Sequence, residues 1–442
     1  MKQKPMILYA LGNLPASMLL LAVATWLMRL YCPTEDEKER KLLLSPATYG
    51  TISSVCMVIA AVADFVVGFL SDRCSSRMGR RKPFIVFGLP FLALSFLLVW
   101  FPPVGHISVA NIVWLAGTLG VLFVSFTVVV NPYLALMPEV WQDERERVRV
   151  SVFMAVSGTL AQVVAFALFG VAISTLSSGL SFLGVFLADG YKFAAVIGFF
   201  ITVLSFLPTL IFISERPHSK EKEVPFGLFE AGRATLTNKA FLPYLGASAA
   251  LYAAQFLIEA VLPYLVVTRV VEDESKADMV ASLILLGLVV LTAFLYPVAD
   301  ALSRKYKKKD MFLFCLMSFA VLLPFTTLAG SIPFIPPIAH VILGCLLISP
   351  ALAIGLVIPR AILAEVMDYD TTITGYRREA MYNGMEGLFQ KIASGVVPLI
   401  QGLLFSVFGY SKAEPYGIVA CGFAAGFLSL LGYLSFKRYP LG

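Results

Sequence analysis

Long apolar stretches separated by short polar segments are the main pattern along this chain. A bilayer core of about 30 Å needs roughly 20 apolar residues in a helix, so these stretches are long enough to span it. Several are rich in Gly and Ala, which favours close packing between helices in lipid. The pattern predicts twelve transmembrane helices, at about 6–30, 46–71, 84–102, 110–137, 150–175, 190–213, 240–267, 278–302, 310–329, 338–366, 380–407 and 416–436.

Two segments of the chain resemble each other and indicate an internal repeat. Each ends an apolar stretch with an aspartate followed by a basic cluster. Alignment of the two segments pairs Asp72 with Asp300, 228 positions later. Segments 132–139 and 359–365 repeat at nearly the same offset. We therefore predict an all-α integral membrane protein of two pseudo-symmetric six-helix bundles, the usual plan of a secondary transporter. The predicted parts are an N-terminal bundle (1–213), a cytoplasmic linker (214–239) with a short amphipathic piece near 226–237, and a C-terminal bundle (240–442).

Composition supports membrane insertion and narrows the class of partner. The chain is 59% hydrophobic and only 14% charged, with a mean hydropathy of +0.84. Soluble proteins carry about 25% charged residues. The net charge of +6 comes from basic clusters beside apolar stretches, which is typical of contact with an anionic lipid surface and argues against nucleic acid. The six cysteines show no CxxC spacing, so we expect neither disulfides nor a metal site.

The positions of Lys and Arg predict the orientation in the membrane. With both termini cytoplasmic, 24 of the 34 basic residues fall in inner segments and eight in outer segments. This asymmetry follows the positive-inside rule. The first apolar stretch is longer than a signal-peptide core and has no evident cleavage site, so we expect it to remain as the first helix.

The remaining two basic residues, Arg360 and Lys391, fall within predicted helices, as does Asp64. A charge near mid-membrane costs several kcal/mol unless it is paired or binds something, so Asp64 and Lys391 are candidates for cation or proton coupling. They are expected to pair. One interpretation is a permanent structural ion pair; the other is a pair that breaks and reforms as the coupling ion binds.

Polar stripes on otherwise apolar helices predict a solute site between the bundles. Tyr252, Gln255 and Glu259 lie at spacings that share one helical face. Such residues can also serve only as hydrogen-bonding partners between helices, at about 0.6–2 kcal/mol each. The candidate solute-binding residues are Asn13, Ser17, Thr127, Asn131, Tyr252, Gln255, Glu259, Asn383, Glu386 and Gln390. Trp26 is expected to pack rather than to stack on a sugar ring.

Charged residues at the inner ends of the helices predict a cytoplasmic gate. Oppositely charged groups there can hold one conformation and separate when the bundles rock. The alternative is that the basic residues only set topology. The candidate gate residues are Asp72, Arg73, Arg80, Arg81, Asp300, Arg304, Arg377 and Arg378.

Other classes of protein fit poorly. The three histidines are far apart, and the sequence contains no HExxH motif, nucleophile elbow or P-loop, so we do not expect an enzyme. Repeated gate motifs in two halves favour alternating access over the continuous pore of a channel.

Three groups of residues carry a resemblance to a known family. They are the run Gly68–Pro83, the residues Pro132, Tyr133, Ala135, Leu136 and Pro138, and above all Asp368, Tyr369, Asp370, Gly375, Arg377, Arg378, Glu379 and Tyr382. With these residues the chain resembles the glycoside-pentoside-hexuronide:cation symporters, a branch of the major facilitator superfamily that includes the melibiose permeases and, more distantly, the lysolipid symporters. The resemblance covers essentially the whole chain and implies the major facilitator fold.

The resemblance also implies functional positions, and several of them differ in this chain. Family members place two cation-binding carboxylates one turn apart in helix two; here the second is Asp64, but the first is Ala60. The family's sugar-binding carboxylates in helices one and four correspond to Ser17 and Val130, whereas its helix-eleven lysine is present as Lys391. These differences weigh against sodium coupling and against a typical galactoside substrate.

We therefore expect a secondary active transporter that couples proton movement, in preference to sodium, to symport of a sugar or glycoside by alternating access. Uniport or exchange, symport of a lysolipid-like or other amphipathic solute, and a transport-dead sensor of the same fold are the alternatives. The expected partners are the solute, the coupling ion (H⁺ or Na⁺) and the lipid bilayer, without another cofactor. We expect a monomer in the plasma membrane.

Overall fold

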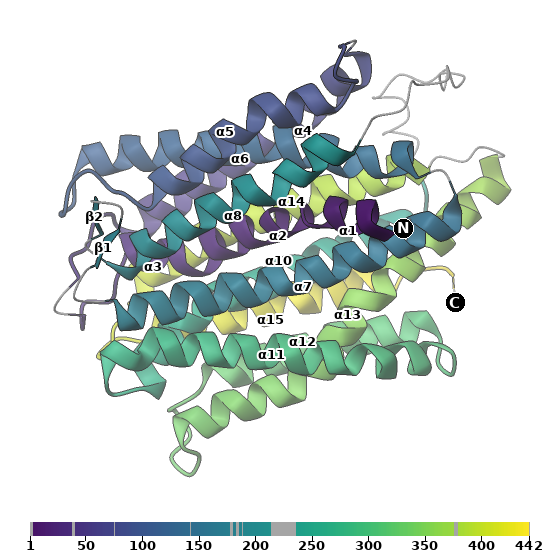
Figure 1. Cartoon of the computed structure of the whole chain (residues 1–442). Coiled ribbons are helices and arrows are strands. Elements are labelled where there is room, and N and C mark those ends of the chain that lie inside the picture. Colours follow the sequence, from purple (N-terminus) through teal and green to yellow (C-terminus); the bar gives the residue numbers. More distant parts are fainter. Residues whose placement is uncertain are drawn as a thin grey trace. The chain divides into compact units, whose positions relative to one another are not determined.

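Twelve helical segments long and apolar enough to cross a membrane are present in the part of the chain that the structure describes. The structure is a computed structural model that describes residues 3–37, 40–74, 76–141, 143–176, 180–182, 185–187, 189–213, 236–374 and 379–441 (Figure 1). The segments coincide with the twelve stretches predicted from the sequence, which confirms that prediction.

The chain divides into two compact units. Unit 1 comprises Met1–Lys222 and Asp273–Leu286, and unit 2 comprises Glu223–Glu272 and Gly287–Gly442. Helix α11 (Glu274–Ser303) therefore begins in unit 1 and ends in unit 2. Most of the segment 214–239, including nearly all of the expected amphipathic piece, lies outside the described residues. The division into two six-helix bundles with a linker stays a prediction.

Unit 1 begins with a helical span that changes its hydrogen-bonding pattern along its length. Helices α1 (Gln3–Ala10) and α2 (Asn13–Ala22) are followed by a π-helical turn, η1 (Val23–Leu27), and by α3 (Met28–Tyr31). The longer helices that follow are α4 (Pro46–Arg73), α5 (Lys82–Val99), α6 (Val109–Val140), α7 (Glu144–Thr175) and α8 (Gly190–Phe212). A short antiparallel hairpin, β1 (Leu180–Phe182) and β2 (Val185–Leu187), precedes α8 and was not predicted.

Local sequence explains where several of these helices begin. The Ser45 hydroxyl accepts a hydrogen bond from the Thr48 amide at the start of α4, and Pro46 occupies the first helical position, where its missing N–H costs nothing. Asp189 caps α8 in the same way through the Lys192 amide. These caps satisfy amides that the first turn of a helix leaves without intrahelical partners.

Unit 2 repeats features of unit 1. Its first span is α10 (Phe241–Leu265), which also ends in a π-helical turn, η2 (Val266–Val270). Arg29 follows η1 closely, and Arg269 lies within η2. The later helices are α12 (Lys308–Thr327), α13 (Pro337–Thr374), α14 (Glu379–Phe408) and α15 (Tyr416–Phe436). The shared turn supports the internal repeat seen in the sequence.

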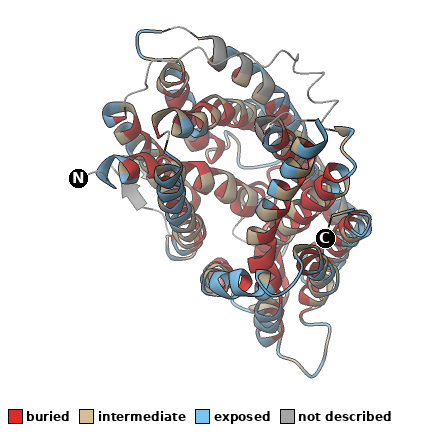
Figure 2. Cartoon of the chain, turned by 90° about the vertical axis from the view of Figure 1, so that its right-hand side faces the viewer, coloured by how far each residue is buried: buried red, intermediate tan, exposed pale blue. Residues whose placement is uncertain are grey.

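Most helices carry both buried and exposed residues (Figure 2). Many of the exposed residues are large and apolar. Phe87 and Phe294 are 71% and 76% exposed, which suits a surface in contact with lipid rather than water. Toward their neighbours the helices present small residues: a Cβ at Gly198 of α8 would lie 2.6 Å from the Phe96 ring of α5. Glycine therefore permits a close approach of these two helices.

Candidate functional site

The predicted coupling carboxylate lies against a predicted solute-binding residue. Asp64 is half-buried on α4, and Asn131 Nδ2 of α6 donates a hydrogen bond to Asp64 Oδ1 over 2.8 Å. One turn earlier on α4, Ala60 is buried and offers no oxygen. The structure thus brings together two residues that sequence analysis had assigned to different roles, and it leaves Asp64 as the one carboxylate at these two positions of α4.

The other predicted residues of unit 1 differ in exposure. Asn13 Nδ2 on α2 donates to the Met154 carbonyl of α7 over 2.9 Å, where Gly158 leaves room for Asn13 and the half-buried Ser17. Thr127 is fully buried within the unit. Trp26 is also fully buried, and its indole N–H donates to the Ala165 carbonyl over 3.2 Å. Trp26 therefore packs, as predicted.

Unit 2 contains the predicted polar stripe on α10. Gln255 Nε2 donates to Glu259 Oε1 over 2.9 Å, and Tyr252, Gln255 and Glu259 are all half-buried. The amide orients the carboxylate without neutralising it. Such a pair can exchange its mutual hydrogen bond for bonds to a polar solute.

A second polar group in unit 2 joins α10 to α14. Glu386 is buried and accepts hydrogen bonds from the Tyr244 hydroxyl and from Ser248 Oγ, the latter over 3.3 Å. Gln390 Nε2 in turn donates to Ser248 Oγ over 3.1 Å. Sequence analysis identified Glu386 and Gln390 but missed Tyr244 and Ser248. Their four-residue spacing, continued by Tyr252, placed them on the stripe already recognised.

Lys391 and Asn383 are the remaining predicted residues of α14. Lys391 is half-buried and Asn383 is exposed. Because Asp64 belongs to unit 1 and Lys391 to unit 2, their pairing stays a prediction.

The candidate gate contains ion pairs that repeat between the two units. In unit 1, Arg80 Nη2 and Arg81 Nε lie 2.6 and 3.1 Å from Glu139 Oε1 at the end of α6. In unit 2, Lys308 Nζ lies 2.6 Å from Glu365 Oε1 of α13. Arg80 and Lys308 are related by the offset of 228 positions that also relates Asp72 to Asp300. The acidic partners lie in the two segments, 132–139 and 359–365, whose similarity the sequence revealed without showing its role.

The other gate residues are described only in part. Asp300 Oδ2 and Arg304 Nη2 form the expected pair over 2.7 Å. Asp300 lies in the last turn of α11, Arg304 directly follows its end, and both are exposed. The side chains of Asp72 and Arg73, and the whole of Arg377 and Arg378, lie outside the described residues.

A buried cluster of four charges lies at the opposite ends of the unit 1 helices, and sequence analysis did not identify it. Arg29 binds both oxygens of Glu37, at 2.5 and 3.1 Å, and its Nη2 lies 3.0 Å from Asp278 Oδ1. Arg40 Nη1 lies 3.0 Å from Glu37 Oε2 and 3.2 Å from Asp278 Oδ2. Arg40 is 30% exposed, whereas the other three side chains are at most 6% exposed. Two arginines and two carboxylates thus neutralise each other largely away from water.

Glu37 is a carboxylic acid of this cluster that lies in a loop, outside the membrane-spanning helices. Burial alone would raise the pKa of its carboxyl, but Arg29 and Arg40 beside it hold that pKa below the ordinary value. The amide and hydroxyl of Thr34 also donate to Glu37 Oε1, over 3.0 and 2.8 Å. The signal in the sequence was the loop before α4, in which acidic residues alternate with Arg40 and its basic neighbours.

Among the described residues, no group of three or more His, Cys, Asp or Glu side chains is arranged to hold a metal ion. The polar side chains described above are carboxylates, amides and hydroxyls.

Known proteins share both sequence and fold with this chain. The "uncharacterized symporter YnaJ" of Bacillus subtilis is 26% identical over 409 residues, which cover 91% of this chain and 82% of that protein. The "putative glycoside/cation symporter YagG" of Escherichia coli is 33% identical over 125 residues, 27% of this chain and 26% of that one. The "sodium-dependent lysophosphatidylcholine symporter 1" of Xenopus tropicalis is 34% identical over 92 residues, 20% and 17%.

The fold is shared with solved transporters at low sequence identity. The crystal structure of the D-xylose–proton symporter matches with a TM-score of 0.67 at 13% identity, covering 96% of each chain. The family described as "MFS/sugar transport protein" matches residues 8–430. Its members are transporters and not enzymes. With twelve candidate spans and a match over nearly its full length, the chain belongs to the MFS/sugar transport family of the major facilitator superfamily, in agreement with its resemblance to the glycoside-pentoside-hexuronide symporters.

Proposed function

We propose that this protein is a proton-coupled symporter of a sugar or glycoside that works by alternating access. The observation that carries the proposal is the half-buried Asp64, held by Asn131 within a membrane-spanning helix. An ionisable group at such depth is costly to maintain and marks an ion pathway by default. Lys391 is the proposed partner whose positive charge neutralises the Asp64 carboxylate when no proton is bound to it.

The choice of proton over sodium rests on the number of oxygen ligands. Hard cations are bound by several oxygens. At the two positions one turn apart on α4, this chain offers one carboxylate, because Ala60 replaces the other. A proton, by contrast, needs a single carboxylate, and Asp64 supplies one.

The choice of a sugar rests on the polar groups of unit 2. Glu259 with Gln255, and Glu386 with Ser248, present carboxylate, amide and hydroxyl groups on α10 and α14. Sugar hydroxyls are recognised by such donors and acceptors, and a solute that lacks them leaves buried polar groups unpaired. The name of YagG, a putative glycoside/cation symporter, supports this choice.

A lysolipid-like or other amphipathic solute is the second candidate. Ser17 and Val130 stand where the resemblance implies sugar-binding carboxylates, and part of the chain is similar to a sodium-dependent lysophosphatidylcholine symporter. We further propose a monomer in the plasma membrane. Its termini are both cytoplasmic in this proposal, which the distribution of Lys and Arg supports. Labelling of single cysteines introduced at the termini and at Glu414 with an impermeant thiol reagent tests the orientation.

The decisive experiment is uptake into proteoliposomes under an imposed proton gradient and, separately, a sodium gradient. The solutes are a panel of radiolabelled glycosides and lysophospholipids, and the proteins are the wild type, Asp64→Asn and the loop control Glu414→Gln. Glycoside uptake driven by protons in the wild type and control but lost in Asp64→Asn supports the proposal. Uptake driven by sodium contradicts the proton coupling, and uptake of lysophospholipids alone favours the second candidate.

A further inference from the structure

Two tyrosines of unit 1 each bind the backbone of the other's helix. The Tyr9 hydroxyl of α1 donates to the Tyr133 carbonyl of α6 over 2.5 Å, and the Tyr133 hydroxyl donates to the Tyr9 carbonyl over 2.7 Å. Their rings stack with centroids 4.6 Å apart, and both side chains are fully buried. Trp141 packs edge-on against Tyr9, and Phe206 of α8 packs edge-on against Tyr133. We call Tyr9 and Tyr133 the tyrosine clasp.

The clasp lies at the break between α1 and α2 in the first span. In a continuous α-helix the Asn13 amide would donate to the Tyr9 carbonyl, four residues earlier. Here the Tyr133 hydroxyl bonds to the Tyr9 carbonyl and lies within hydrogen-bonding reach of the Asn13 amide. A Cβ at Gly12 would lie 2.7 Å from the Tyr133 ring, so glycine is what lets the ring come this close. The clasp therefore ties the start of α2 to α6.

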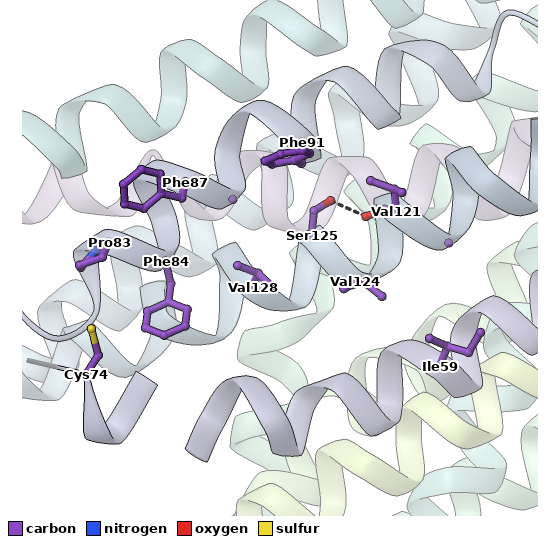
Figure 3. A pocket seen from close by; sticks show the side chains of 12 residues that line it. Ile59, Cys74, Pro83, Phe84, Phe87, Phe91, Val121, Val124, Ser125 and Val128 are labelled. Carbon is purple, nitrogen blue, oxygen red and sulfur yellow. Dashed lines mark hydrogen bonds between the residues drawn. The ribbon is translucent and has the colours of Figure 1, made fainter. Parts of the chain in front are cut away.

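Helix α6 is weakened next to the residue that binds Asp64. Pro132 lies inside α6 and has no amide N–H, so the Val128 carbonyl loses its intrahelical partner. Val121, Val124 and Val128 border an apolar hollow of about 660 Å³ between α5 and α6, as Figure 3 shows. Packing from α5 therefore restrains this face of α6 less than a close-packed core would.

The clasp holds α6 on the other side of this weak point. Asn131, whose Nδ2 lies 2.8 Å from Asp64 Oδ1, directly precedes Pro132, and Tyr133 directly follows it. The Tyr9 hydroxyl fixes the Tyr133 carbonyl, two residues from Asn131. A shift of Tyr133 would therefore move Asn131 relative to α4.

We propose that Tyr9 and Tyr133 are positioning residues of the candidate coupling site and hold Asn131 against Asp64. Two buried rings and two hydrogen bonds replace the restraint that Pro132 removes from the backbone of α6. The inference rests on the proposed coupling role of Asp64. It adds two residues that act on Asp64 through Asn131.

The test is the rate at which dicyclohexylcarbodiimide labels Asp64 in the full chain, in detergent at neutral pH. This reagent reacts with the protonated form of a carboxyl group, and mass spectrometry of the digested protein measures the label on the peptide that contains Asp64. The Asn131 amide stabilises the ionised carboxylate, so its removal favours the reactive form. Asn131→Leu is therefore expected to raise the labelling rate about tenfold, the factor expected for one hydrogen bond to a charged group.

Variants of the clasp are expected to reproduce this effect in part. Tyr133→Phe and Tyr9→Phe each remove one hydroxyl and should each raise the labelling rate of Asp64 at least about threefold. When Tyr133→Phe is added to Asn131→Leu, the rate should equal that of Asn131→Leu alone, because residues that act through one another are not additive.

A third variant and a matched control complete the set. Gly12→Ala pushes the Tyr133 ring aside without removing a hydroxyl, and it takes the place of Tyr133→Phe should that variant fail to fold, as judged by gel filtration. Tyr31→Phe is the control. Tyr31 is also fully buried in unit 1, and its hydroxyl donates to the Val99 carbonyl over 2.9 Å, so the same group is lost away from Asn131. The labelling rate of this variant should equal that of the wild type.

Three results would overturn the proposal. Unchanged labelling in the folded clasp variants means that Asn131 keeps its place without the clasp. A further rise when Tyr133→Phe is added to Asn131→Leu means that the tyrosine acts on Asp64 by another route. An equal rise in Tyr31→Phe means that any lost tyrosine hydroxyl loosens unit 1. Because labelling does not depend on uptake, an absence of proton-driven uptake would contradict the proposed function without changing these labelling rates.

Discussion

Arg29 and Asp278 are 249 positions apart in the sequence, yet Arg29 Nη2 lies 3.0 Å from Asp278 Oδ1. Both side chains are buried, at 0% and 4% exposure. The pair links the first turns of α11 to α3 within unit 1. The rest of α11 belongs to unit 2. An ion pair at this position can hold the first turns of α11 in place.

Removal of one charge from this pair is expected to destabilise unit 1 strongly. Asp278→Asn leaves Arg29 buried with half of its compensation, and breaking a buried pair costs about 3–5 kcal/mol. Asp273→Asn is the matched control, because the Asp273–Lys276 pair is mostly exposed and such pairs contribute about 0–1 kcal/mol. Thermal unfolding in detergent measures both.

Asp278→Asn should also expose the packing contact between α11 and α7 that lies next to the Arg29–Asp278 pair. Ser282 is buried on α11 and donates to the Phe166 carbonyl over 2.9 Å. In a protein without native cysteines, Ser282→Cys is expected to react slowly with an impermeant thiol reagent, and severalfold faster once Asp278→Asn is added. Unchanged reactivity would show that the cluster does not hold α11 against unit 1.

Glu37 gives this cluster a defined response to acid. Its pKa in the folded protein is below the ordinary value of 4.5, so ionised Glu37 stabilises the fold at pH above that value. The stabilisation is lost as the pH falls through the lowered pKa. The unfolding midpoint of Glu37→Gln should therefore lie below that of the wild type at pH 7, and the difference should shrink below about pH 4.5. A difference that grows on acidification would contradict this assignment.

The ion pairs at the candidate gate should differ in strength according to their exposure. The Arg80–Glu139 side chains are 21% and 19% exposed, those of Lys308–Glu365 are 36% and 39%, and those of Arg304–Asp300 are 78% and 57%. Exposed pairs contribute about 0–1 kcal/mol. We expect destabilisation in the order Glu139→Gln, Glu365→Gln, Asp300→Asn, with the last close to zero. Chemical unfolding of the three variants tests the order, and a largest effect from Asp300→Asn would contradict it.

The features that the sequence predicted well are those with a simple period or repeat. The twelve spans follow from apolar length alone, and the polar stripe of Tyr252, Gln255 and Glu259 follows from helical periodicity. Partners distant in sequence could not be found in this way. The bond between Asn131 and Asp64, and the salt bridges of Glu139 and Glu365, depend on which helices are neighbours.

The buried charge cluster was missed for a physical reason. In the sequence Arg29, Glu37 and Arg40 look like residues of a solvated loop, and Asp278 looks like the polar start of a helix. Only the return of α11 to unit 1 buries them together. Once buried, their mutual neutralisation explains why two acidic residues occur beside two arginines at this place.

Tyr244 is predicted to position Glu386 for solute binding. Its hydroxyl donates to Glu386 from the same face of α10 that carries Ser248 and Tyr252. Tyr244→Phe removes a hydrogen bond to a charged acceptor, worth about 1.5–3 kcal/mol, and lets the carboxylate turn. The KM for the transported solute is expected to rise about tenfold with the maximal rate changed less. Tyr306→Phe, an exposed tyrosine of unit 2, serves as the control.

The preference for protons over sodium is expected to depend on the side chain at position 60, which in this chain is the methyl group of Ala60. Ala60 lies one turn before Asp64 on α4, at 2% exposure. In Ala60→Asp a second carboxylate would face the same space, and two carboxylates with the Asn131 side chain supply the oxygens that a hard cation needs. We expect uptake by Ala60→Asp to become stimulated by a sodium gradient, at least about tenfold over the wild type. Ala60→Asn is the matched control, because it adds nearly the same shape without the charge and should stay insensitive to sodium. Ala60→Asp could fold and retain proton-driven uptake yet gain no response to sodium. In that case the missing carboxylate is not what excludes sodium, and the argument for proton coupling from Ala60 fails.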